Sequence, residues 1–214
     1  MPIRQFGPQR PRARGFTIVE LAIAIVVIGL LLTAIMRTTG LIGTSQSQAI
    51  QSAIGSLSSA IAQFRSRYGY LPGDIPNATT VIPGVVAGSC SATANGNGDG
   101  QIDSGESACV PLHLFDAGLI KGGTGSITFS LPGGIVTIRA IAASASAIAA
   151  TTYSFPSSTR NVIEVLNAPC QVAQDIDNKM DDGNFSTGNV RASVTSCTVG
   201  GTNDPVPSIA VALQ

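Results

Sequence analysis

Residues 16–36 read FTIVELAIAIVVIGLLLTAIM, an apolar run of 21 residues in which Glu20 is the single charged side chain. A helix of this length spans roughly 30 Å, which matches the hydrocarbon core of a bilayer. The run therefore predicts one membrane helix, over residues 16–37, in a chain of 214 residues.

The residues before this run carry an excess of positive charge. Arg4, Arg10, Arg12 and Arg14 precede it, with no acidic residue among them. Positive charge accumulates on the cytoplasmic side of membranes, so the pattern predicts a cytoplasmic N-terminus and an exported C-terminal part. A secretory signal peptide would have a shorter apolar region and a small-residue cleavage site. The end of the run, LLTAIMRTTG, shows no such site.

Glu20 is the residue that an ordinary signal anchor does not explain. A carboxylate within a membrane helix costs free energy, so such acids serve a function and need a cationic partner. Glu20 lies four residues after Phe16, in the first turns of the expected helix. No basic side chain lies within residues 16–36, so the partner must come from elsewhere.

The stretch RGFTIVEL, residues 14–21, followed directly by the apolar run, resembles the processing site of type IV prepilins and type II secretion pseudopilins. This resemblance implies that residues 1–15 are a leader peptide and that a membrane peptidase cuts between Gly15 and Phe16. The same enzyme would N-methylate Phe16. Glu20 would be the fifth residue of the mature chain and would pair with the Phe16 amine of a neighbouring subunit. That amine has a reference pKa of about 7.7–8.0 and is largely protonated near neutral pH.

The resemblance also implies a function and a set of partners. We expect a structural subunit of a type IV pilus-like filament, held in the inner membrane with its head exported until it is assembled. The implied partners are the prepilin peptidase, other pilin-like subunits, and an inner-membrane assembly platform with its ATPase. The alternatives are a minor or tip subunit, a type II secretion pseudopilin, or a membrane-anchored calcium-dependent binding module that does not polymerise.

Beyond the membrane, residues 38–68 continue a helical pattern. Apolar side chains recur every three or four residues, which is the spacing of one helix face, at Ile50, Ile54, Leu57, Ile61 and Phe64. The helix is expected to end near Tyr68-Gly69, because the following LPGD cannot continue it.

The remaining residues, 69–214, predict a globular α+β head. Strand patterns occur at 126–131, 135–142, 162–166, 191–199 and 208–213. Short helices are expected after Cys109, stopped by Gly122-Gly123, and from Ala168-Pro169 to just before Asp181. A long helix packed on a small antiparallel sheet is the predicted architecture.

Residues 95–106 carry the spacing of a calcium-binding loop. An EF-hand loop places oxygen ligands at positions 1, 3, 5, 7, 9 and 12 and glycine at position 6. Here Gly100 occupies the glycine position, and the candidate ligands are Asn95, Asn97, Asp99, the carbonyl of Gln101, Asp103 and Glu106. The first ligand is Asn rather than Asp, and no EF-hand helix precedes the loop. A solvated turn rich in Asn, Gly and Asp is the alternative.

The four cysteines indicate disulfides in an exported domain. Cys90 and Cys109 bracket the loop at 95–106, so a bridge between them would restrain it. A bridge between Cys170 and Cys197 would tie the C-terminal region, as one does in many type IV pilins. Four cysteines allow three pairings, and the sequence does not choose among them.

Composition argues against other classes of protein. Hydrophobic residues make up 44% and charged residues 11%, the opposite of a disordered chain. Without residues 1–15 the chain keeps eight basic side chains against twelve acidic ones, so no footprint for nucleic acid is left. His113, the single histidine, lies in an apolar stretch where packing is its expected role. No nucleophile elbow or phosphate-binding glycine motif is found, which favours a structural protein over an enzyme.

A second acidic stretch lies near the C-terminus, at Asp175, Asp177, Asp181 and Asp182. It is interpreted as a solvated helix end and turn, with a cation site or a contact with a basic patch on another subunit as the alternatives.

Overall fold

The computed structural model describes residues 17–121, 127–131, 134–149, 154–194, 196–197 and 205–213. The chain divides into two compact units, Met1–Ile42 and Gly43–Gln214. The longest element, α1 (Ile18–Tyr68), begins in the first unit and ends in the second. No helix among the described residues combines the length and the hydropathy that a membrane span requires.

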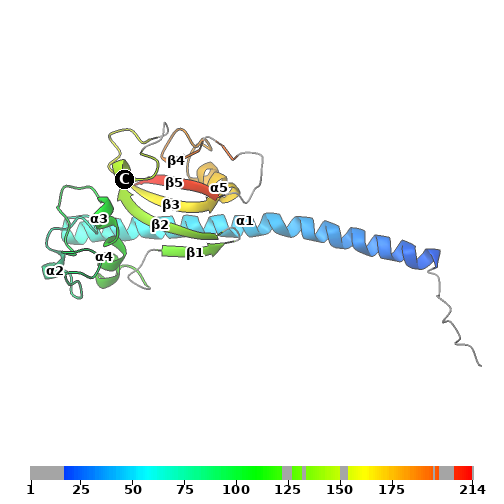
Figure 1. The fold of residues 1–214 in the computed structure, drawn as a ribbon, viewed down its shortest axis with the longest axis horizontal. Helices are drawn as coiled ribbons and strands as arrows, with labels where there is room; N and C mark the ends of the chain where they lie inside the picture. Colours follow the sequence, from blue (N-terminus) through cyan, green and yellow to red (C-terminus); the bar gives the residue numbers. More distant parts are fainter. Residues whose placement is uncertain are drawn as a thin grey trace, which may run out of the picture. The chain divides into compact units, whose positions relative to one another are not determined.

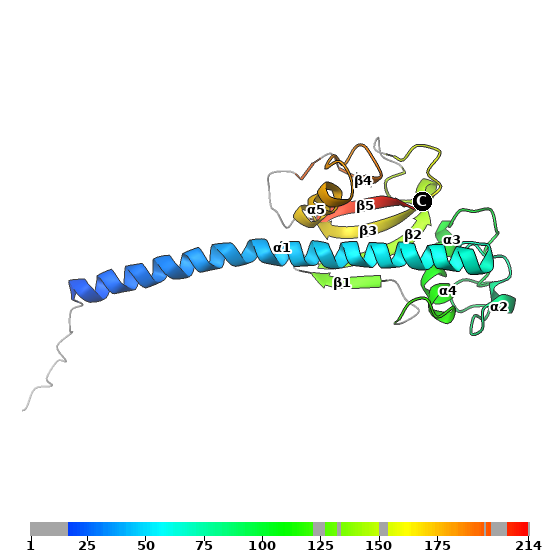
Figure 2. The same ribbon diagram turned by 180° about the vertical axis from the view of Figure 1, so that it is seen from behind.

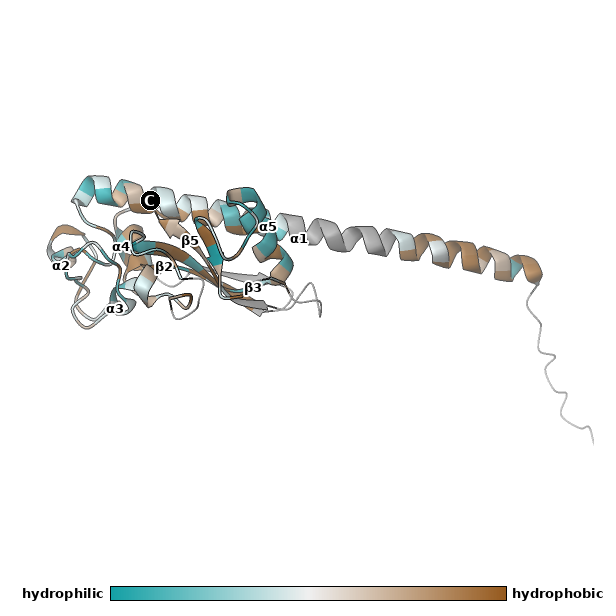
Figure 3. Ribbon diagram, turned by 90° about the horizontal axis from the view of Figure 1, so that it is seen from above, coloured by the Kyte–Doolittle hydropathy of each residue, from teal (hydrophilic) through white to brown (hydrophobic). Residues whose placement is uncertain are grey.

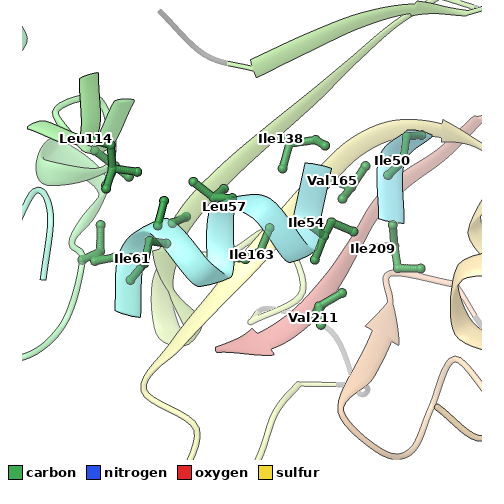
Figure 4. Packing of buried hydrophobic residues seen from close by; sticks show 14 of the residues in the cluster. Ile50, Ile54, Leu57, Ile61, Leu114, Ile138, Ile163, Val165, Ile209 and Val211 are labelled. Atoms are coloured by element: carbon green, nitrogen blue, oxygen red, sulfur yellow. The ribbon is translucent and has the colours of Figure 1, made fainter. Parts of the chain in front are cut away.

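The second unit is built around the C-terminal half of α1. Its apolar stripe is buried as the sequence predicts, since Ile50, Ile54 and Ile61 are all at most 2% exposed. Figure 4 shows these side chains packed against the sheet, on Ile163 and other residues of the same sheet face. α1 ends at Tyr68, and Gly69 follows with φ +79°, a backbone conformation that glycine adopts without steric cost.

One antiparallel sheet covers this part of α1 (Figures 1 and 2). Its strand order is β1-β2-β3-β5-β4, so the C-terminal strand lies between β3 and β4. The strands are β1 (Ile127–Leu131), β2 (Gly134–Ala142), β3 (Asn161–Pro169), β4 (Val190–Ala192) and β5 (Pro205–Leu213). All five lie where the sequence predicts strands, although β4 covers only the start of the stretch expected at 191–199, and residues 195 and 198–199 of that stretch are not among those described.

Both faces of the sheet carry buried apolar side chains, a large cluster on the α1 side and a small cluster on the other side. Successive side chains of a strand point to opposite faces, so Ile163 and Val165 pack on α1 while Val162 and Glu164 point away. The face turned away from α1 holds a second small cluster, formed by Ile141, Ala143, Ile148, Val162 and Ala210. A helix on one face of an antiparallel sheet gives an α+β, pilin-like fold, as the sequence predicts.

Short elements fill the segments between α1 and the first strand and between later strands of the sheet. They are α2 (Ala78–Val81), α3 (Ser104–Ser107), α4 (Val110–Asp116), the 3-10 helix η1 (Ala143–Ala145) and α5 (Cys170–Met180). The sequence predicts α4 and α5 but not α2 or α3, which are each a single turn.

The end of α4 differs from the sequence prediction. The helix was expected to stop at Gly122-Gly123, which lie outside the described residues, but it ends at Asp116. Gly118 has φ +74°, and the Leu119 N–H donates to the Leu114 carbonyl at 2.9 Å. This is the Schellman arrangement, in which a left-handed glycine closes the helix. Gly118 is therefore the stop signal.

Candidate functional site

The N-terminus of α1 is closed by a reciprocal cap. Thr17 directly precedes the helix, and its backbone N–H and hydroxyl both donate to Oε2 of Glu20, each at 2.9 Å. In return, the Glu20 N–H donates to the Thr17 hydroxyl at 3.2 Å. This capping box satisfies free N–H groups of the first turn. It also places the Glu20 carboxylate at the positive end of the helix dipole.

Residues 21–32, which follow this cap, are all apolar or glycine, and this part of α1 is mostly brown in Figure 3. The large side chains between 18 and 32 are between 47% and 88% exposed, and they include Ile18, Leu21, Ile25, Val27, Leu30 and Leu32. A helix that is hydrophobic all round is stable in a membrane or in the core of a large assembly. This segment therefore needs a covering of lipid or of other chains.

In the second unit, the loop of residues 95–106 wraps around the carboxylate of Asp74, which no sequence pattern indicates. Asp74, fully buried, accepts hydrogen bonds from three successive backbone N–H groups of the loop, at 2.7–3.0 Å. These donors belong to Gly98, Asp99 and Gly100. Burial raises the pKa of Asp74, although the three N–H donors act in the opposite direction. Asp74 therefore organises the part of the loop that contains the glycine position.

The candidate calcium ligands of this loop take part in its own hydrogen bonds. Asn97 Oδ1 accepts from the Asp99 N–H at 2.9 Å, and Asp99 Oδ1 accepts from the Gln101 N–H at 2.8 Å. Asn95 Oδ1 accepts from Thr79 N–H, outside the loop. These hydrogen bonds stabilise the turns of the loop and join it to Thr79.

Glu106 closes the loop from its other end. Its two carboxylate oxygens accept from the N–H groups of Asn97 and Asp103, at 2.8 and 2.9 Å. Glu106 and Asp103 form the capping box of α3. Burial raises the pKa of Glu106, and the charge of Asp74 adds to the effect. Among the described residues, the carboxylate oxygens of Asp99, Asp103 and Glu106 do not all lie within 4.8 Å of one another. Calcium binding by this loop therefore rests on the sequence spacing and stays a prediction.

One family model matches the chain, and the match includes the N-terminal part of α1. The prokaryotic N-terminal methylation motif matches residues 10–36, which include the capped start of α1 and its exposed apolar turns. The chain carries the signature of type IV pilins and pseudopilins. Neither a curated protein nor a solved structure matches the chain significantly.

The matched motif covers Glu20 and the residues around it. Gly15 and Phe16, where processing is expected, lie outside the described residues. Thr17, the second residue of the expected mature chain, is the helix cap. The methylation motif implies a substrate of a prepilin peptidase and a pilin-like assembly.

Two disulfides restrain the pilin-like head. The structure pairs Cys90 with Cys109 and Cys170 with Cys197, which are the two pairs considered in the sequence analysis. The first bridge joins the two sides of the 95–106 loop. The second ties the start of α5 to the segment after β4. In the usual model each bridge adds roughly 3 kcal/mol by restricting the unfolded chain.

His113 is a packing residue, as its apolar surroundings suggest. The imidazole is fully buried, its Nδ1 accepts from the Gly73 N–H at 2.9 Å, and its Nε2 lies 3.0 Å from the Ala94 carbonyl. Since Nδ1 is the acceptor, the proton sits on Nε2 and is donated to Ala94. His113 thus joins α4 to the turn after α1, through Gly73, and to Ala94, the residue before the 95–106 loop.

An ion pair between a buried carboxylate and a partly exposed arginine lies on the opposite face of the sheet, and no sequence signal singles it out. Glu164 is fully buried and pairs with Arg139 at 2.6 Å, directly across β2 and β3. It also accepts from the Ser208 hydroxyl at 2.8 Å and from the Ala147 N–H at 2.7 Å. With all these partners, the Glu164 carboxylate has its charge paired and its oxygens hydrogen-bonded, so its role is structural.

Proposed function

We propose that this chain is a structural subunit of a type IV pilus-like filament, processed between Gly15 and Phe16 and assembled through α1. The carrying observation is the N-terminal half of α1, which combines a match to the methylation motif with apolar side chains exposed on all faces. Before assembly, lipid covers this segment in the inner membrane. In the filament, the same segments of other subunits cover it.

The Glu20 carboxylate sets the register of assembly in this proposal. Cleavage at Gly15 frees the α-amine of Phe16, which is largely protonated near neutral pH. Oε2 of Glu20 is held by Thr17 at the helix end. The amine of a neighbouring subunit approaches this fixed carboxylate as the helices bundle. An unpaired charge in an apolar bundle is costly, so the paired register is favoured.

The partners follow from the same proposal. A prepilin peptidase removes the leader, and an inner-membrane platform with its ATPase extracts the subunit into the filament. The subunit is a pilin or pseudopilin, and the alternatives to a major pilin are a minor or tip pilin and a type II secretion pseudopilin. Stoichiometry in purified filaments separates them, because a trace amount excludes a major subunit.

Substituting Glu20 separates its charge from its role as a cap. Glu20→Gln keeps an oxygen that can accept from Thr17 but removes the charge, so we expect incorporation into sheared filaments to fall at least tenfold. Thr17→Ala weakens the cap and keeps the charge, so we expect most of the incorporation to remain. Cleavage of the leader should be unchanged in both variants. Normal incorporation of Glu20→Gln would overturn the pairing proposal.

Calcium binding by residues 95–106 is a separate proposal, supported by the EF-hand spacing of Asn95, Asn97, Asp99, Asp103 and Glu106. Thermal melting of the full chain in detergent, with millimolar calcium and with chelator, tests it. We expect calcium to raise the melting temperature, and Asp99→Ala to reduce that rise. A rise that is the same in Asp99→Ala would contradict binding at this loop.

A further inference from the structure

The C-terminal end of α5 carries a group of three carboxylates that the proposed assembly does not use. Asp177 lies in the last turns of the helix, and Asp181 and Asp182 follow the helix directly. One carboxylate oxygen of each lies within 4.8 Å of the other two. These three residues are called the α5 acidic cluster below. In Figure 3, α5 stands out as a largely hydrophilic element of the second unit.

Asp177 is the member of the cluster that its own surroundings do not explain. Its side chain is fully buried, and within the described part of the chain neither carboxylate oxygen has a hydrogen-bond partner. A buried carboxylate without a partner is strongly unfavourable. The buried carboxylates of Asp74 and Glu164 are both satisfied by donors of their own, so Asp177 stands apart from them.

Asp181 and Asp182 are held in place by the loop that follows. Asp181 Oδ2 accepts from the Val190 N–H at 2.9 Å. Asp182 accepts from the Asn184 N–H at 2.9 Å and from the Thr187 hydroxyl at 2.6 Å. These bonds fix two carboxylates beside the third without neutralising any of them.

The electrostatics of the cluster favour a cation. Burial, followed by the charges of Asp182 and Asp181, raises the pKa of Asp177 to about 6, and the nearby Gly183 N–H offsets part of the rise. The C-terminal end of a helix adds partial negative charge. The carboxylates thus repel one another at a point where the helix also disfavours them.

Two basic side chains of this region, Lys179 and Arg191, bond to other groups, and the charge of Arg191 also helps to lower the pKa of Asp182. Lys179, the basic residue in the last turn of α5, donates to the Ser47 hydroxyl at 3.3 Å. Arg191 donates to the carbonyls of Ser154 and Gly188, at 2.7 and 3.3 Å. Among the described residues, the ion pair present joins Arg139 and Glu164 and involves no member of this cluster.

We propose that the α5 acidic cluster binds a hard divalent cation, calcium in the first instance, with Asp177 as its central ligand. Three carboxylates at the end of α5 offer the oxygen ligands that calcium takes in flexible geometry, with water completing the shell. The bound ion removes the repulsion and satisfies Asp177. It also ties the end of α5 to the 181–190 loop that leads into β4.

The test measures calcium binding to the full chain in detergent by titration calorimetry. Asp99→Ala serves as the background, so that heat from the 95–106 loop is reduced. We expect binding in the range of about 10⁻⁴–10⁻³ M, typical of extracellular sites. Asp177→Asn should weaken it at least tenfold. Asp175→Asn is the matched control, because it removes one charge from the same helix outside the cluster, and it should bind as the background does.

Thermal melting supplies a second test. Replacing an aspartate with a purely structural role would not remove a calcium-induced rise in melting temperature. About 5 mM calcium should raise the melting temperature of the background by ~3–5 °C. Asp177→Asn should melt no lower than the background without calcium, because it removes an unpartnered charge, and should lose the rise.

If Asp177→Asn does not fold, Asp182→Asn, at an exposed position, takes its place in both assays. No calcium heat in the background, or equal binding and an equal rise in Asp177→Asn, would overturn the site. Magnesium in place of calcium, with the same losses, would assign the site to the smaller ion.

Discussion

The single imidazole of the chain connects three segments that are distant in the sequence. His113 on α4 accepts from Gly73 and donates to Ala94, and its ring stacks on Phe64 of α1 with a centroid distance of 6.3 Å. Both ring nitrogens are used only while the imidazole is neutral. A proton on Nδ1 would leave the Gly73 N–H without its acceptor.

The titration of His113 should show this preference for the neutral form. Burial lowers its pKa below the ordinary value of 6.5. Its contribution to stability is therefore complete above pH 6.5 and is lost as the pH falls toward the lower folded-state pKa. Because the chain has one histidine, its imidazole resonances can be followed without assignment of others. An NMR midpoint below 6.5 is expected, and a midpoint at or above 6.5 would contradict the buried neutral imidazole.

At the scale of elements, the 95–106 loop is a packed part of the second unit, with its backbone pressed against the turn that follows α1. The Gly96 N–H donates to the Ile75 carbonyl at 2.9 Å, and a Cβ at residue 96 would overlap with backbone atoms of Gly73 and Asp74. Ile102 is fully buried, and its N–H donates to Asn161 of β3 at 2.8 Å. The loop therefore depends on contacts that a solvated turn would not have.

Two alanine substitutions measure how tightly this loop is packed. Gly96→Ala forces the loop away from Gly73 and Asp74, and we expect a loss of about 1–3 kcal/mol in unfolding free energy. Gly105→Ala is the matched control, since nothing lies within 4 Å of a Cβ there and the residue is in α3. It should be neutral or stabilising by up to about 1 kcal/mol. Denaturant unfolding of both variants in detergent gives the comparison, and equal stabilities would contradict the packed loop.

The elements themselves were largely predictable, because their signals are local. The stripe from Ile50 to Phe64 predicts the buried face of α1, and the strands follow from alternating and β-branched residues. The contacts of Asp74, the partner of Glu164 and the isolation of Asp177 were not predictable. Each depends on which distant backbone or side-chain groups surround a carboxylate, and no spacing in the sequence encodes that environment.

At the scale of the whole molecule, the two units differ in how far they bury their apolar side chains. The second unit buries its apolar residues on its own, with α1 on one face of the sheet and a smaller cluster on the other. The first unit leaves large apolar side chains exposed from Ile18 to Leu32. Solubility and assembly therefore depend on what covers this segment, and the methylation motif that it contains points to a filament.

The most direct test of the account is the mature N-terminus, determined by mass spectrometry in cells with and without the prepilin peptidase. We predict a chain that begins at N-methylated Phe16 when the peptidase is present and an intact leader, residues 1–15, when it is absent. An intact leader in both strains, or cleavage at another position, would contradict the filament account.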